Sequence, residues 1–236
     1  RIYFREGSKW KYYGNANNQH NKALGYYNNK TLETGDSGQM ATSADGKVYI
    51  LYTNRTNRVS SSSVLYCYDT NKYVKDDTTP FEPDWVTPIN GKLVRYNAQG
   101  VVCGADGTIY VTTGVNGNDK ARVTAVSPDG QLKWESFADG DIAGSAAVDN
   151  ENYVYYNDYV LGKLVKLSPA DGNKVAEIQL ATDMRSSPTI SIDGTIYCTG
   201  MKDGKPTLFA VKGSATSHAA GWSQLGGNPS KTCVLY

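Results

Sequence analysis

Two acidic residues in matching positions are the first candidates for chemistry in this chain. Asp141 and Asp183 each precede a run of small residues, Gly144-Ser145-Ala146 and Ser186-Ser187, and the second copy follows about forty residues after the first. Carboxylate oxygens that recur there could bind calcium at the mouth of a channel. The alternative is that they cap turns by accepting hydrogen bonds from backbone N–H groups. Arg185, close behind Asp183, is a further candidate for a residue that lines a binding surface.

Aromatic residues beside amides and carboxylates form the second group of candidates. The chain has 18 Tyr, 4 Trp and 4 Phe residues, so most of its rings carry a polar atom. Such rings suit stacking on carbohydrate or hot spots for a protein partner. The predicted ligand- or partner-binding residues are therefore Trp85, Asp141, Tyr156, Tyr159, Asp183 and Arg185.

The chain offers little for nucleophilic catalysis. Gly35-Asp36-Ser37-Gly38 resembles the nucleophile motif of chymotrypsin-like proteases, but the only histidine before it is His20, in an Asn-rich stretch. A serine nucleophile needs a histidine base within hydrogen-bond reach and an acid to orient that base. We therefore expect that this protein is not an enzyme and has no catalytic residues.

The cysteines also argue against a metal site. Cys67, Cys103, Cys198 and Cys233 include no Cys-x-x-Cys pair, and the chain has only two histidines, so zinc is not expected. The first three lie in apolar runs, where a thiol behaves as a small buried hydrophobe. Cys233 is the one candidate for a disulfide. No cofactor is expected, with calcium at Asp141 and Asp183 as the open alternative.

Charge and hydropathy exclude two kinds of partner. The 24 basic and 23 acidic residues give a formal net charge of +1, and no basic run is interleaved with aromatic residues. Binding to nucleic acid is therefore not expected. No apolar run approaches the roughly 18 residues that span a bilayer, so no membrane span is expected. The chain opens on Arg1 without Met or a signal peptide, which indicates a boundary left by processing or cloning.

The elements that must position these residues follow from a repeat. Four copies of a turn lead into a short strand that carries a tyrosine, at Asp45-Gly46 to Tyr49, Asp106-Gly107 to Tyr110, Glu151-Asn152 to Tyr155 and Asp193-Gly194 to Tyr197. Asp-Gly favours a tight hairpin turn because glycine adopts positive φ without strain. A repeat of about forty residues, with short strands and such turns, is typical of a β-propeller blade of four antiparallel strands.

The repeat predicts one all-β propeller domain over residues 1–236. A partial blade with an Asn- and Gly-rich loop covers 1–38, and blades follow at about 39–99, 100–144, 145–186 and 187–236, making four to five in all. In two repeats the outer strand follows a Pro-containing turn, with Trp134 or Val175 as its buried residue. Because the first blade lacks inner strands, we expect the chain to be the C-terminal part of a longer propeller.

Three segments resemble the PQQ-like repeat family of propellers. Ala125–Trp134 and Ser168–Val175 resemble the repeats themselves. Gly221–Thr232 is similar to a segment that borders such propellers. The quinoprotein dehydrogenases of this family hold pyrroloquinoline quinone, usually with calcium, a catalytic Asp and often an adjacent Cys pair. This chain has no adjacent cysteines and few of the docking tryptophans, so PQQ is not expected. The resemblance is closer to the BamB-type envelope lipoproteins, which bind proteins or surface polymers.

That resemblance implies a non-catalytic binding or scaffolding propeller of the bacterial cell envelope. Its expected location is extracytoplasmic, in the periplasm or at the cell surface, with a protein partner held across one face of the propeller. A carbohydrate-binding surface protein is the first alternative, and its partner would be an envelope glycan. A fragment of a PQQ-dependent dehydrogenase is the second alternative.

Overall fold

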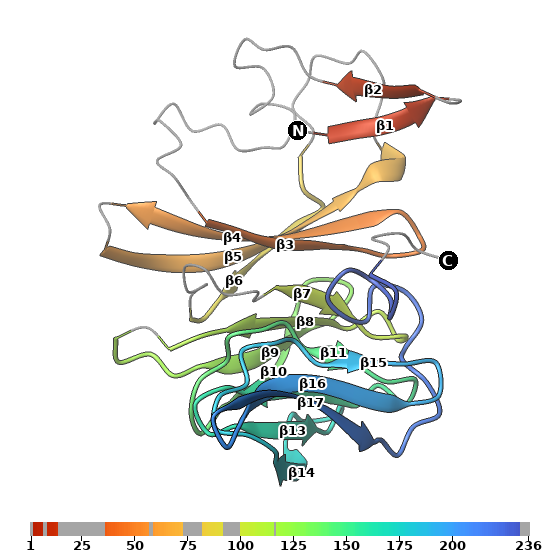
Figure 1. Ribbon diagram of the computed structural model, residues 1–236. Coiled ribbons are helices and arrows are strands. Elements are labelled where there is room, and N and C mark those ends of the chain that lie inside the picture. The colour runs from red at the N-terminus through yellow and green to blue at the C-terminus, as the bar shows by residue number, and fades with distance from the viewer. Residues whose placement is uncertain are drawn as a thin grey trace.

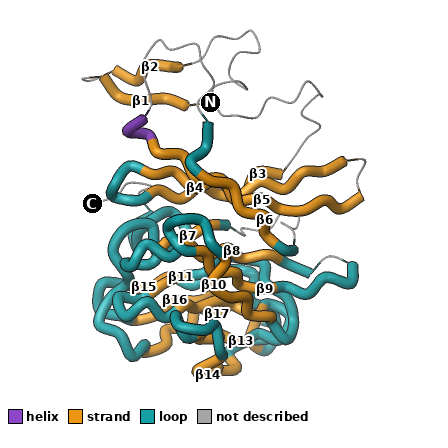
Figure 2. Tube along the Cα trace, turned by 180° about the vertical axis from the view of Figure 1, so that it is seen from behind, coloured by secondary structure: helices purple, strands orange, loops and turns teal. Residues whose placement is uncertain are grey.

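The structure is a computed structural model in which residues 2–6, 9–13, 36–56, 59–72, 82–91, 100–115 and 117–231 are described. Within these ranges the regular secondary structure is β-strand, apart from the short 3-10 helix η1 (Thr70–Lys72). The antiparallel sheets extend from that of β1 and β2 at one end of the molecule, through that of β3 to β6, to the end that carries β14, and the sheet of β15 to β17 lies before that end (Figures 1 and 2). The predicted all-β propeller fold is therefore confirmed.

Each sheet consists of consecutive strands, and we number the blades in chain order. Within the described residues, blade 1 contains β1 (Ile2–Glu6) and β2 (Lys9–Tyr13). Blade 2 contains β3 (Asp36–Thr42), β4 (Lys47–Thr56), β5 (Val59–Asp69) and β6 (Trp85–Ile89). Blade 3 contains β7 (Val101–Cys103), β8 (Ile109–Thr113), β9 (Arg122–Val126) and β10 (Leu132–Phe137). Blade 4 contains β11 (Ala147–Val148), β12 (Val154–Asp158), β13 (Lys163–Leu167) and β14 (Lys174–Gln179). Blade 5 contains β15 (Thr189–Ile190), β16 (Thr195–Lys202) and β17 (Lys205–Lys212).

The turn between the first two strands of each blade explains the sequence repeat. Gly46, Gly107 and Gly194 have φ angles of 88°, 79° and 77°, in the left-handed region that glycine adopts readily. The atypical copy has Asn152 at this place, with φ 66°. Asparagine tolerates that conformation better than most residues. Asn152 therefore preserves the turn.

Hydrophobic clusters fill the space between successive blades. One cluster joins blades 3 and 4 and includes Val123 and Val154, and another joins blades 4 and 5 and includes Leu164 and Ile196. A middle blade is thus covered on both faces, and all five residues of β12 are buried. Strands covered on both faces lose the alternation of apolar and polar residues that marks a half-exposed strand.

In blades 2 and 3, three paired side chains on neighbouring strands form a row that ends at the next blade. In blade 3, Tyr110 pairs with Ala125 and Ala125 pairs with Trp134. The corresponding row in blade 2 is Tyr49, Cys67 and Trp85. Each row ends in an indole on the outer strand, and that indole packs on the following blade. This pattern positions neighbouring blades relative to one another.

The row differs in blade 4, and one sequence prediction is wrong there. Tyr155 pairs with Lys166, and Lys166 pairs with Ala176, so Ala176 holds the place of the tryptophan. Val175, which was predicted to be the buried residue, is 53% exposed. Blades 3 and 4 both have a bulge at this place, and in both the inward residue is the fourth after the turn glycine. Ala176, and not Val175, therefore corresponds to Trp134.

Three cysteines are buried free thiols, as the sequence predicts: Cys67, Cys103 and Cys198. Burial raises the pKa of Cys67 and of Cys198 to about 12, and it raises the pKa of Cys103 as well. These groups are therefore protonated and poor nucleophiles at neutral pH. Cys233, the disulfide candidate, lies outside the described residues.

A C-terminal segment, residues 217–228, lies along the inner strands of three blades. The backbone N–H groups of Cys103 in blade 3 and Val148 in blade 4 donate to the carbonyls of Trp222 and Ser223, each over 2.8 Å. In blade 5 the buried amide of Gln224 accepts from Ile190 N at 2.8 Å and donates to Ile190 O at 3.1 Å. The segment therefore ties together strands that do not pair with one another.

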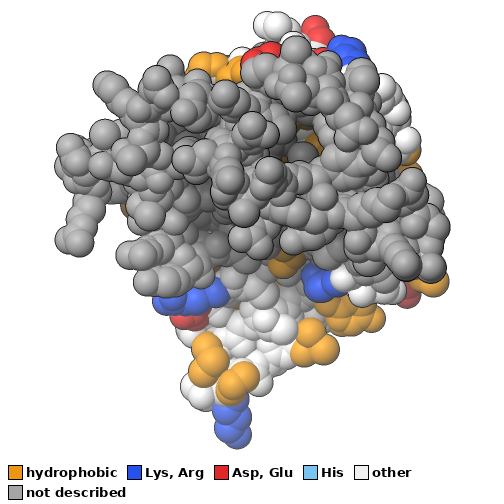
Figure 3. Space-filling model, turned by 90° about the horizontal axis from the view of Figure 1, so that it is seen from above, with side chains coloured by type: hydrophobic (Ala, Val, Ile, Leu, Met, Phe, Trp, Pro, Cys, Tyr) orange, Lys and Arg blue, Asp and Glu red, His pale blue; other side chains and the backbone are white. Residues whose placement is uncertain are grey.

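The surface carries charges of both signs. Figure 3 views the molecule from the end that carries β1 and β2, and basic, acidic and hydrophobic side chains are interspersed where described atoms are visible. This agrees with a formal net charge of +1. In the part of the chain that is described, no helix has the length and apolar character needed to cross a membrane.

Candidate functional site on the loop face

The order of the strands divides the connections of each blade between two faces. In an antiparallel sheet of consecutive strands, the loop after the second strand and the connection after the fourth lie at the same end. Residues 114–121 and 159–162 are such loops, and 138–146 and 180–188 are such connections. We call the face that carries them the loop face. Four of the six predicted site residues lie in these segments.

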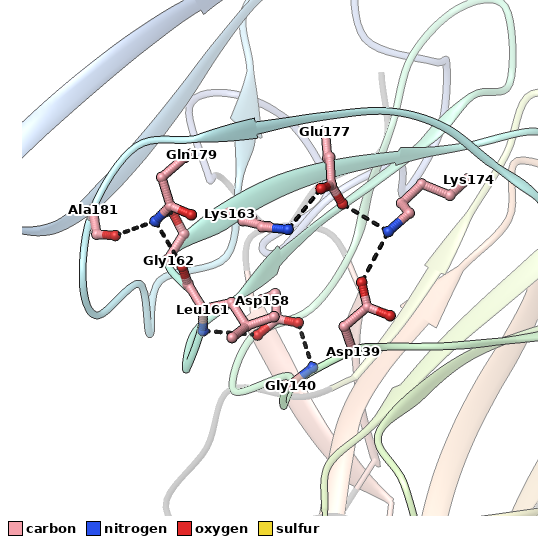
Figure 4. Close-up of polar contacts among 10 residues, drawn as sticks. All are labelled: Asp139, Gly140, Asp158, Leu161, Gly162, Lys163, Lys174, Glu177, Gln179 and Ala181. Carbon is pink, nitrogen blue, oxygen red and sulfur yellow. Dashed lines mark hydrogen bonds and ion pairs between the residues drawn. The ribbon is translucent and has the colours of Figure 1, made fainter.

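Asp141 organises the backbone of the loop face. Its Oδ1 atom accepts hydrogen bonds from Val115 N at 2.7 Å and from Ile142 N at 2.8 Å, and the residue is buried. Asp158 does the same beside it, accepting from Gly140 N at 2.7 Å and Leu161 N at 3.1 Å (Figure 4). Both carboxylates therefore hold loops in place. Among the described residues, no group of three or more His, Cys, Asp or Glu side chains could hold a metal ion.

Tyr159 and Arg185 meet above this frame. The guanidinium carbon of Arg185 lies 5.0 Å from the centre of the Tyr159 ring, and Arg185 Nε lies 3.2 Å from Asp183 Oδ1. The N–H of Tyr159 donates to the carbonyl of Asp141 over 2.9 Å. Partial burial, and then the negative charge of Asp141, raise the pKa of Tyr159, so its hydroxyl stays protonated at neutral pH. The structure thus brings Asp141, Tyr159, Asp183 and Arg185 together.

A shallow pocket of 430 Å³ continues from this cluster over blade 5. Its lining includes Asp183, Arg185, Thr199, Met201, Pro206 and Leu208. The side chain of Arg185 is 68% exposed, and Leu208 is 66% exposed. We call Tyr159, Asp183, Arg185 and Leu208 the rim site.

Exposed apolar residues extend the rim site along the loops of blades 3 and 4. Val115, Val160 and Leu161 are exposed, and the N–H of Val115 is held by Asp141. Sequence reasoning did not select these residues or Leu208. The available signal was an apolar residue within a loop between two strands, at Val160-Leu161, because loops of this kind are usually polar.

The other two predicted site residues lie elsewhere. Trp85 is half-buried at the contact between blades 2 and 3, where its Nε1 donates to Pro128 O over 3.0 Å. Tyr156 is only 3% exposed and belongs to the cluster between blades 3 and 4. Burial raises the pKa of Tyr156, and its ring is not available at the surface. Both residues therefore serve the packing of blades and not the rim site.

The architecture, but not the sequence, is similar to that of known proteins. No protein-family model matches the sequence, and no curated protein matches it. A protein of unknown function from Bacteroides caccae aligns over 84% of this chain and 69% of its own, with 11% identity and a TM-score of 0.51. A luciferin-regenerating enzyme aligns over 81% of this chain and 66% of its own, with 11% identity and a TM-score of 0.52. BamB from Moraxella catarrhalis aligns over 82% and 53%, with 16% identity and a TM-score of 0.46.

These likenesses concern the fold. This chain spans about two thirds of the length of the Bacteroides caccae protein and of the luciferin-regenerating enzyme, and only 53% of the length of BamB. A TM-score of 0.46 is too low to support a relationship with the BamB-type proteins that the sequence motifs resemble. The β-propeller architecture is shared, and membership of the PQQ-like family remains a resemblance of sequence segments.

The expectation that this protein is not an enzyme is contradicted. The luciferin-regenerating enzyme has a similar propeller fold and is an enzyme by name. A fold positions loops, and the residues on those loops decide whether they bind or catalyse. A propeller architecture therefore does not exclude catalysis, and the comparisons establish a β-propeller fold shared with at least one enzyme.

Proposed function

We propose that this chain is a binding propeller that recognises a protein partner through the rim site. The observation that carries this proposal is Arg185, an exposed guanidinium held between the ring of Tyr159 and the carboxylate of Asp183. Arginine and tyrosine are enriched among the residues that dominate the energy of protein interfaces. An arginine that is already oriented loses less conformational entropy when a partner binds.

The surroundings of Arg185 have the composition of an interface. Leu208, Val160 and Leu161 place exposed apolar area beside the arginine and the tyrosine. Interface cores are depleted in acidic side chains and lysine and enriched in aromatic residues and arginine. The backbone frame made by Asp141 and Asp158 keeps this surface in a fixed shape.

The expected location of this function is the bacterial cell envelope. The support is the resemblance of Ala125–Trp134 to the PQQ-like repeats of envelope propellers, and of Gly221–Thr232 to a segment that borders such propellers. A protein partner is favoured over a glycan because Tyr156, one of the predicted binding residues, is buried and its ring is not available for stacking on a sugar. Within the rim site, Tyr159 is the ring available for stacking.

Affinity capture with a charge-matched control tests the proposal. Immobilised wild-type protein is passed over a cell-envelope extract, and each retained protein is then titrated against Arg185→Gln and Lys72→Gln. Both variants lose one positive charge, but Lys72 lies in η1, which follows the third strand of blade 2 and so belongs to the face opposite the loop face. We expect Arg185→Gln to weaken a specific partner by about 2 kcal/mol, roughly thirtyfold in Kd, as for an interface hot spot.

Two outcomes would contradict the proposal. One is a purified partner that binds Arg185→Gln and Tyr159→Ala as tightly as the wild type. The other is equal weakening by Lys72→Gln, which would indicate attraction by net charge instead of recognition at the rim site. Thermal unfolding of each variant checks that the fold is intact, and an exposed side chain such as Arg185 is expected to change stability by less than about 0.5 kcal/mol.

A further inference from the structure

Two contacts between blades in this chain bind an indole ring in the same way. Trp85 Nε1 donates to Pro128 O over 3.0 Å, and Trp134 Nε1 donates to Pro169 O over 3.0 Å. Both acceptors lie in the turn that leads to the outer strand of the following blade. The chain therefore shows in two places that this contact between blades accepts an indole ring.

The walls of the two contacts also correspond. The Trp85 ring lies 6.0 Å from the ring of Tyr49, and the Trp134 ring lies 5.7 Å from the ring of Tyr110. On the opposite side each indole lies against a glycine of the next blade, where a Cβ atom would come within 2.7 Å of Trp85 or 2.5 Å of Trp134. Each slot thus has a tyrosine wall, a flat glycine wall and a carbonyl acceptor.

The third copy of the slot, between blades 4 and 5, is open. Tyr155 provides the tyrosine wall, but Ala176 stands where the tryptophan would be. A pocket of 320 Å³ is found there, and its lining includes Tyr155, Lys166, Ala176, Ile196, Gly213 and Ser214. We call this pocket the open slot. The tyrosine wall and the position of the missing indole match the filled slots, but the glycine wall is not repeated. Gly130 follows Val126 by four residues, and the residue that follows Val211 by four is Ala215.

The carbonyl side of the open slot follows from the register of the strands. Val126, Leu167 and Val211 are equivalent, because each pairs with the residue before the repeat tyrosine: Ile109, Val154 and Ile196. Counted from these residues, Gly213 holds the place of Pro128 and Pro169, and it lines the pocket. The backbone of Gly213 therefore corresponds to the acceptor that each tryptophan uses.

The open slot differs from the filled ones in its charge. Lys166 Nζ lies 3.6 Å from the centre of the Tyr153 ring and donates to Ser214 Oγ over 2.6 Å. Lys212, which also lines the pocket, donates to the carbonyl of Asp193 over 3.0 Å. Both ammonium groups have neutral partners in these contacts. Glu177, the acidic residue of the lining, is held by two lysines instead.

We propose that the open slot binds a tryptophan side chain of a partner polypeptide, with an acidic side chain next to that tryptophan. The indole takes the place that Trp85 and Trp134 take in the filled slots, and the acidic group is complementary in charge to Lys166 and Lys212. Access is open because all six residues of β14 are exposed. This site is separate from the rim site, so the two proposals stand or fall independently.

A fluorine-labelled peptide gives a direct test. The probe is acetyl-Gly-(5-fluoro-Trp)-Glu-Gly amide, and its fluorine NMR signal is followed as the protein is added. We expect the wild type to shift and broaden the signal. The Ala176→Trp variant is expected to lose at least tenfold in affinity because its own indole fills the slot, whereas Ala176→Ser, with a small side chain at the same position, keeps the affinity.

Two further comparisons check the chemistry of the occupant. Replacing Glu by Gln in the peptide is expected to weaken binding several-fold to the wild type and clearly less to Lys166→Met, which removes one of the two positive charges and keeps the length of the side chain. Replacing fluoro-Trp by 4-fluoro-Phe is expected to weaken binding because the donor to Gly213 is lost. If Ala176→Trp fails to fold, Ile178→Glu provides the blocking variant, since Ile178 lines the pocket and is exposed.

The proposal is overturned by either of two results. In one, folded wild-type protein leaves the fluorine signal unchanged at millimolar peptide. In the other, Ala176→Trp and Ile178→Glu bind the peptide as tightly as the wild type, which would place the peptide elsewhere. Lys72→Gln, which removes one positive charge in blade 2 and away from the pocket lining, serves as the control and is expected to leave binding of this peptide unchanged.

Discussion

Blades 3 and 4 meet through a buried indole, whereas blades 4 and 5 meet around an open pocket. Trp134 is 8% exposed and joins its own strand to the next blade through one hydrogen bond and broad ring contact. At the same place in blade 4, Ala176 leaves a volume of 320 Å³. The two contacts share the tyrosine wall and the strand register, but the described part of blade 5 has three strands and Ala215 in place of the turn glycine, so the next blade also contributes to the difference.

Charged groups replace the indole as the support of the outer strand in blade 4. Glu177 bridges Lys163 and Lys174, at 2.6 and 2.7 Å, and Lys174 also contacts Asp139 at 2.9 Å (Figure 4). Exposed ion pairs contribute little to stability and are screened by salt, whereas a buried aromatic ring contributes several kcal/mol. The comparison indicates that the outer strand of blade 3 is bound firmly and that of blade 4 weakly.

The largest effect is expected from Trp134→Ala. Removal of a buried tryptophan typically costs about 3–5 kcal/mol through lost contacts and the cavity left behind. Urea unfolding of the variant and the wild type measures the change. Trp85→Ala should cost less because Trp85 is only half-buried. Equal losses in the two variants would show that burial does not decide the contribution of these rings.

A smaller loss is expected from Trp134→Phe. The ring contact with Tyr110 and Gly172 is largely kept, but Pro169 O loses its donor. Leaving a buried acceptor without a partner costs about 1–3 kcal/mol, and the lower end is expected here because this hydrogen bond is only part-buried. The same unfolding measurement applies, and a loss as large as that of Trp134→Ala would mean that the hydrogen bond, not the ring, holds the blades together.

Ala176→Trp should act in the opposite direction. Filling a pocket between blades commonly adds about 0.5–2 kcal/mol to the free energy of unfolding. Ala176→Ser is the control, because it changes the residue without filling the volume. A destabilised Ala176→Trp protein would contradict the equivalence of the three slots, and Lys166, which pairs with Ala176, would be the first residue to examine.

The smallest effect is a change in how stability declines at acidic pH. Hydrogen bonds from Lys163 and Lys174 lower the pKa of Glu177 to about 2 from its usual 4.5. The ionised carboxylate therefore stabilises the folded state above pH 4.5, and this stabilisation is lost as the pH falls from there toward 2. Glu177→Gln should flatten the decline of the melting temperature over that interval at low salt. At high salt, where exposed ion pairs are screened, the variant and the wild type should converge.

Much of the architecture could be read from the sequence, and the failures have physical reasons. The Asp-Gly turns and the tyrosines after them predicted the blades, because a hairpin turn is formed by residues that are close in sequence. The matching positions of Asp141 and Asp183 indicated that both lie on the same face of the propeller. They lie on the loop face, together with Tyr159 and Arg185. Tyr156 was misjudged because a strand covered on both faces shows no alternation.

The open slot was missed because Val175 was taken as the counterpart of Trp134. Ala176 follows the turn glycine Gly172 by four residues, as Trp134 follows Gly130, so its place in the row could be read from the sequence. The pocket itself could not, because part of its lining comes from blade 5, distant in sequence. The role of residues 217–228 was equally hidden, because their partners are distant in sequence and the contacts run through backbone atoms and one glutamine.

The pairing of residues 217–228 with three inner strands has a consequence for how the protein folds. Each hairpin of a blade forms from neighbouring residues, but Trp222 must reach back to Cys103, and Ser223 to Val148. Closing such long loops is costly in entropy, and proteins rich in distant contacts fold slowly. We therefore expect folding in two phases: fast assembly of the individual blades, then a slow step in which this segment joins them along their inner edge.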